Sequence, residues 1–134
     1  MQLIKKSEML WVFGFGAIIY ALIEVLFRGY THWSMALAGG LAFSLIYFMN
    51  LKIHTQSLII RCLAGSAIIT AIEFTAGLIV NITFHMNVWD YSAERYNILG
   101  QICPLFSFAW FLICIPATVF SFLFRSMFCG SKKV

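Results

Sequence analysis

Four apolar segments dominate this chain, and each is long enough to cross a membrane. They cover residues 9–27, 33–51, 58–80 and 102–124. A hydrocarbon core about 30 Å thick is crossed by a helix of about 20 apolar residues. Because lipid offers no hydrogen-bonding partners, the backbone within each segment must be helical. The sequence therefore predicts an all-α, polytopic membrane protein built as a bundle of four transmembrane helices.

The composition agrees with this fold and excludes several classes of function. The 134 residues are 62% hydrophobic and 10% charged, against about 25% charged residues in a typical soluble domain. We expect one transmembrane domain over residues 1–134, with its longest loop at 81–101. The sequence has no G-x-x-x-x-G-K phosphate loop, so energy for any transport would come from another chain or an ion gradient. We expect no cofactor and no nucleic-acid partner.

Basic residues are distributed unevenly between the two ends of the predicted helices. One end carries seven basic residues and the other end carries two. The seven are Lys5, Lys6, Lys52, Arg61, Arg125, Lys132 and Lys133, and the two are Arg28 and Arg95. Cytoplasmic loops and tails of membrane proteins carry the excess of Lys and Arg. We therefore expect both termini in the cytoplasm, the loop at 81–101 outside, and the chain in the cell membrane.

Two glutamates lie inside the apolar segments, Glu24 in the first and Glu73 in the third. An ionisable group at this depth is costly unless it is paired, solvated or neutralised. In the expected orientation both glutamates lie in the outer half of the membrane. Arg28 follows Glu24 by one turn on the same helix face, and Asp90 and Arg95 belong to the outer loop just above. The sequence predicts that these residues form one polar cluster.

Small and polar residues recur at helical spacing in every segment. Such stripes let helix backbones approach closely in lipid and mark the packed side of each helix. Helix packing alone accounts for each stripe, and only the ionisable residues suggest a further role. The predicted stripes, in chain order, are Gly14, Ala17, Ala21, Glu24 and Arg28; Ser34, Ala38 and Ala42 with Ala36, Gly40 and Ser44 beside them; Ser66, Thr70, Glu73, Gly77 and Asn81; and Cys103, Ser107, Trp110, Cys114 and Thr118.

Several short motifs point to a known family. They are Ile-Glu-Val at 23–25, Ile-Glu-Phe-Thr-Ala-Gly at 72–77, Trp-Asp-Tyr-Ser at 89–92, Asn-Ile-x-Gly-x-Ile-Cys at 97–103 and Phe-Ser-x-x-Trp at 106–110. In these motifs the chain resembles the bacterial family labelled "putative ABC-transporter type IV", to which certain small animal four-span membrane proteins of unknown function are related. The resemblance covers nearly the whole chain. It places the family's signature on Glu24, Glu73, Gly77, Trp89, Asp90, Tyr91, Ser92, Gly100, Ser107 and Trp110.

The charge pattern and the resemblance together predict a transporter-like or channel-like component that binds a small molecule or a cation at an outer-leaflet site. The candidate binding residues are Glu24, Arg28, Glu73, Trp89, Asp90, Tyr91, Arg95 and Trp110. Besides membrane lipids, we expect a homo-oligomer or a larger membrane complex, because four helices are few for a complete permease.

Two other functions stay open. The charges could fix the bundle of a structural or regulatory subunit, or paired carboxylates could serve an intramembrane lipid-modifying enzyme. We assign no catalytic residue and no metal site, since the three histidines lack metal-ligand spacing.

Overall fold

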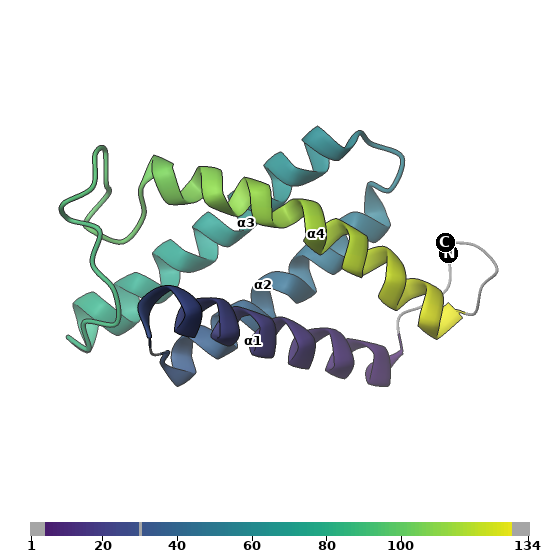
Figure 1. Ribbon diagram of the computed structural model, residues 1–134, viewed down its shortest axis with the longest axis horizontal. Helices are drawn as coiled ribbons and strands as arrows, with labels where there is room; N and C mark the ends of the chain where they lie inside the picture. Colours follow the sequence, from purple (N-terminus) through teal and green to yellow (C-terminus); the bar gives the residue numbers. More distant parts are fainter. Residues whose placement is uncertain (1–4, 30, 130–134) are drawn as a thin grey trace.

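The computed structural model describes residues 5–29 and 31–129, which form a bundle of four long helices (Figure 1). The helices are α1 (Lys6–Arg28), α2 (Trp33–Lys52), α3 (Leu58–Gly77) and α4 (Pro104–Cys129), and α3 continues as a π-helical segment, η1 (Leu78–Thr83). All four are long and apolar enough to cross a membrane. The prediction of an all-α protein with four spans is confirmed.

The helices pair as two hairpins, α1 with α2 and α3 with α4 (Figure 1). The start of α1, the connection between α2 and α3 and the end of α4 lie at one end of the bundle. The loop between η1 and α4 lies at the other end (Figure 1). Every basic-rich segment that the structure describes therefore gathers opposite the long loop.

The helix ends differ from the predicted ones for local reasons. α1 begins at Lys6, before residue 9, because the Glu8 carboxylate accepts a hydrogen bond from the Lys5 backbone amide at 3.3 Å and caps the first turn. α4 begins at Pro104, because Ile102 is still held in the loop by a hydrogen bond from the Ile98 amide, at 3.0 Å, to its carbonyl. α4 also continues past residue 124 and carries Arg125 into the bundle.

The loop begins at Phe84, later than predicted, because η1 prolongs the third span. The turns of η1 are wider than those of an α-helix. The Phe84 amide, for example, donates to the carbonyl of Ile79, five residues earlier, at 3.1 Å. Within η1, the Asn81 side chain donates to Gln101 Oε1 and accepts from the Val88 amide, both at 2.7 Å. Asn81 thus ties the end of the third span to both halves of the loop.

The stripes predicted for the third and fourth segments form the contact between α3 and α4. Ser66 Oγ donates to the Ser107 carbonyl at 2.7 Å, and the hydroxyls of Thr70 and Ser107 are 2.9 Å apart. Trp110, Cys114 and Thr118 are buried further along α4. For this pair of helices the prediction is confirmed.

The stripe predicted for the first helix is wrong in register. The buried side of α1 runs through Glu8, Val12 and Gly16, whereas a Cβ built on Gly14 would meet no atom within 4 Å. Residues two apart lie on nearly opposite sides of a helix, so Gly14 and Gly16 offered two alternative packed faces. A Cβ on Gly39 of α2 would clash with Tyr20 Cβ and lie 3.1 Å from the Gly16 carbonyl oxygen, so the two backbones approach closely at Gly16 and Gly39.

We predict that Gly39→Ala weakens the α1–α2 hairpin, because the new methyl group requires the two helices to separate. The expected loss is about 1–3 kcal/mol of unfolding free energy, the usual cost of overpacking. Gly14→Ala is the matched control, since it adds the same methyl group in open space, and it should stabilise α1 by about 0.5–1 kcal/mol. Unfolding in detergent micelles measures both changes, and equal stability of the two variants would contradict the close approach.

Candidate ligand-binding cavity

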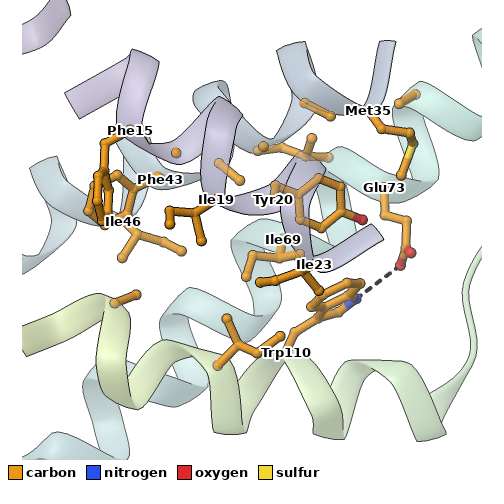
Figure 2. Close-up of a pocket in the computed structure, with 18 of the residues that line it drawn as sticks. Phe15, Ile19, Tyr20, Ile23, Met35, Phe43, Ile46, Ile69, Glu73 and Trp110 are labelled. Atoms are coloured by element: carbon orange, nitrogen blue, oxygen red, sulfur yellow. Dashed lines mark hydrogen bonds between the residues drawn. The ribbon is translucent and has the colours of Figure 1, made fainter. Parts of the chain in front are cut away.

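A cavity of about 190 Å³ lies between the four helices (Figure 2). Its walls are almost entirely apolar, with Ile and Phe side chains from α1, α2, α3 and α4. Glu73 of α3 is the charged residue among its described lining residues, and Tyr20, Trp89 and Trp110 line the cavity as well. The cavity therefore combines an apolar body with one carboxylate.

Glu73 is 5% exposed, and both of its carboxylate oxygens accept hydrogen bonds. Oε2 accepts from the Tyr91 hydroxyl at 2.8 Å, and Oε1 accepts from the Trp110 indole N–H at 3.2 Å (Figure 2 shows the second bond). These three residues, here called the loop-end cluster, come from α3, the loop and α4. Three of the predicted site residues thus meet at one carboxylate.

Aromatic contacts hold the two donors in place. The Tyr91 ring stacks on Phe106, with ring centroids 4.6 Å apart and planes at 4°. Burial, with the nearby Glu73 carboxyl, raises the pKa of the Tyr91 hydroxyl above its usual range, so Tyr91 stays protonated and donates. The centroid of the Trp110 ring lies 5.8 Å from the centroid of the Tyr20 ring on α1. Tyr20 was not among the predicted site residues, and its hydroxyl points toward the Glu73 end of the cavity (Figure 2).

Trp89 and Glu24 lie close to this cluster. Trp89 is buried beside the cavity, and its indole N–H donates to the Gln101 carbonyl at 3.0 Å. Glu24 is half-buried on α1, one turn after Tyr20, and close enough to Glu73 for their charges to interact. Trp89 therefore anchors the loop, and Glu24 lies near the Glu73 end of the cavity.

The other predicted residues lie away from the cavity or outside the described part. Asp90 is exposed, and its Oδ1 accepts from the Ser92 amide at 2.9 Å, which lowers the pKa of the Asp90 carboxyl. Arg95 is exposed on the loop. Arg28 is the last residue of α1, and its side chain lies outside the part that the structure describes. Among the described residues, no group of three or more His, Cys, Asp or Glu side chains could hold a metal ion.

A second buried polar cluster lies at the opposite end of the bundle, and sequence reasoning missed it. Glu8 is 1% exposed and accepts from Arg125 Nη1 at 3.0 Å and 2.9 Å, and from the Tyr47 hydroxyl. This terminal cluster of Glu8, Tyr47 and Arg125 joins α1, α2 and α4. The prediction counts Arg125 among the flanking basic residues, but the structure buries it at 5% exposure.

Asn50 extends the polar contacts at this end to α3. Its Nδ2 donates to Ser121 Oγ at 3.3 Å, and its Oδ1 accepts from Arg61 Nε at 2.9 Å. No helical spacing in the sequence reveals the terminal cluster, because Glu8, Tyr47 and Arg125 lie far apart in the chain and meet only in the fold.

We predict that Glu8→Ala strongly destabilises the protein, because Arg125 would keep its buried charge without the Glu8 carboxylate. Breaking a buried pair in this way costs about 3–5 kcal/mol. The double variant Glu8→Met with Arg125→Met should regain most of that stability, because it removes both charges and keeps apolar volume. Thermal unfolding in micelles compares the variants, and a double variant as unstable as the single one would show that the pair is not the source of the loss.

The comparisons with known proteins agree with this architecture. The sequence matches the family described as "Putative ABC-transporter type IV" over residues 4–129, a range that contains all four spans, the cavity and both polar clusters. Comparison with curated proteins and with solved structures gives no match. Four apolar spans and a match over nearly the whole length lead to one conclusion: the chain is an integral membrane protein that belongs to the "Putative ABC-transporter type IV" family.

Proposed function

We propose that the protein is a transporter-like membrane component whose cavity binds a small molecule with an apolar body and a cationic or hydrogen-bond-donating group. The observation that carries this proposal is the carboxylate of Glu73 at one end of an apolar cavity of about 190 Å³. Apolar cavities of about 150 Å³ stay dry and bind molecules the size of benzene. The cavity is therefore large enough to accept a small apolar group.

Glu73 is suited to recognise the polar group of such a ligand. Tyr91 and Trp110 each donate one hydrogen bond to it, and a carboxylate has about four lone-pair positions, so its oxygens can accept from a ligand as well. A cation would interact with this carboxylate more strongly than in water, because the surroundings have a low dielectric constant. The ring of Tyr20, which lines the cavity, also offers an aromatic face to a cation.

The wider assignment of the chain follows from its topology and composition. The described basic-rich segments gather at the end opposite the long loop (Figure 1), which favours termini in the cytoplasm and a loop outside the cell membrane. The sequence has no phosphate-binding loop, so coupling energy would come from a partner chain or an ion gradient. We propose that several copies, or a larger complex, form the working unit.

One observation favours a second candidate, a structural or regulatory subunit. Both oxygens of Glu73 already accept hydrogen bonds from within the protein, so the carboxylate could serve only to hold α3, α4 and the loop together. In that case its loss would reduce stability and affect no bound molecule. The two candidates therefore differ in whether a neutral, isosteric replacement, which keeps both hydrogen bonds, releases a bound molecule.

We predict that Glu73→Gln abolishes ligand binding and leaves the fold intact. The glutamine oxygen can accept from Trp110, and its amide can donate to the Tyr91 hydroxyl, so both contacts persist without the charge. Native mass spectrometry of protein extracted in mild detergent from its own membrane should show a retained small molecule in the wild type and none in Glu73→Gln. The unfolding temperature should be nearly unchanged.

Glu94→Gln is the matched control, because it removes a loop carboxylate outside the cavity lining. It should retain the small molecule. A wild-type protein that carries no small molecule, or a Glu73→Gln variant that still carries it, would contradict the proposed function. A large drop in unfolding temperature in Glu73→Ala, which removes both hydrogen bonds, with no small molecule in the wild type, would favour the structural subunit.

A further inference from the structure

Side chains fill both ends of the cavity. At the loop end, Glu73 and Trp110 are joined by a hydrogen bond and lie beside Trp89. At the other end, the Phe15 ring packs against Phe120 and Phe124, with both pairs of centroids 5.0 Å apart. The terminal cluster, with Arg125 bonded to Glu8, lies beyond these rings. The described side chains thus obstruct a path along the bundle axis in both directions.

The side between α1 and α4 is covered more thinly. These helices share far fewer contacts than α1 shares with α2, and their aromatic contacts are the Phe15 cluster at one end and the Tyr20–Trp110 pair at the other. Between these contacts, Ile19 and Pro116 line the cavity and are also exposed, Ile19 at 37%. We call this part of the wall, where Ile19 and Pro116 border both the cavity and the outer surface, the window.

The chemistry of the window restricts what can pass. Its border is apolar, and because α1 and α4 are spans, it faces the hydrocarbon of the bilayer. An alkyl chain passes from lipid into this cavity without leaving any polar group desolvated, whereas a hydrated ion would lose its water at an apolar border. The carboxylate lies at the loop end, and Phe43 and Ile46 line the far part of the cavity (Figure 2). The cavity is therefore oriented to receive a polar head near Glu73 and an apolar chain directed away from it.

From this geometry we infer that the ligand is a membrane-dissolved amphiphile with one alkyl chain and an amine or hydroxyl head, and that it enters sideways from the lipid through the window. This inference rests on the proposed function, because it takes Glu73 as the group that binds the head. It adds the class of ligand and its route, neither of which follows from the carboxylate alone.

Photolabelling in vesicles tests the route. The full chain is reconstituted in phosphatidylcholine vesicles with a primary alkylamine whose chain is short enough for a cavity of about 190 Å³ and carries a diazirine near its end. After irradiation, mass spectrometry locates the labelled residues. We expect label on the inner wall at Ala42, Ile46 and Ile69, which line the cavity.

Two variants of neighbouring residues give the matched comparison. Ile19→Phe narrows the window, and inner-wall labelling should fall about tenfold, equivalent to about 1.4 kcal/mol. Ile18→Phe places the same side chain on the outer surface, where Ile18 is 63% exposed, and labelling should be unchanged. Equal inner-wall labelling in Ile19→Phe and Ile18→Phe would overturn entry through the window, as would label confined to the outer faces of the helices.

The outcomes separate this inference from the proposed function. A small molecule that native mass spectrometry finds in the wild type and not in Glu73→Gln, together with no inner-wall label from the amine, would overturn the amphiphile and its route and leave the binding role of Glu73 in place. Inner-wall label that Glu73→Gln does not reduce would overturn the head-group assignment on which the inference rests. Label lost in both Glu73→Gln and Ile19→Phe supports both.

Discussion

The high cost of a carboxylate in apolar surroundings organises this bundle. Glu73 and Glu8 are nearly inaccessible to solvent, at 5% and 1% exposure, and each accepts side-chain hydrogen bonds from other segments of the chain. Glu73 draws together α3, the loop and α4, while Glu8 draws together α1, α2 and α4. Since lipid drives helices together only weakly, these polar contacts determine which helix surfaces meet at each end.

The helices within each hairpin pack more closely than the two hairpins pack against each other. Gly16 and Gly39 bring α1 and α2 into direct backbone contact, and Ser66, Thr70 and Ser107 join α3 to α4 through hydroxyl groups. Between the hairpins, large side chains keep the helices further apart, and the cavity occupies the space that remains. A membrane protein with this arrangement has an internal site whose access depends on how the hairpins sit against each other.

The two polar clusters differ in whether the charge of the carboxylate is compensated by a cation. In the terminal cluster the Glu8 carboxylate is neutralised by Arg125 and bonded to Tyr47, so its charge is compensated within the bundle. In the loop-end cluster the Glu73 carboxylate accepts from Tyr91 and Trp110, which are neutral donors, and it borders a cavity. This contrast assigns a stabilising role to the first cluster and makes the second the better candidate for ligand binding.

The four spans, the packed faces of α3 and α4, and the need of Glu73 for polar partners could all be predicted from the sequence, because hydropathy and the cost of a buried charge are properties of the chain alone. The packed face of α1 could not be predicted in the same way, because Gly14 and Gly16 place small residues on nearly opposite sides of the helix and contact with α2 selects Gly16. The same holds for the pair of Glu8 and Arg125. In the sequence Arg125 counts among the flanking basic residues, and only the fold joins it to Glu8, which lies far away in the chain. The cavity and its window exist only between packed helices, and no spacing along one helix could have revealed them.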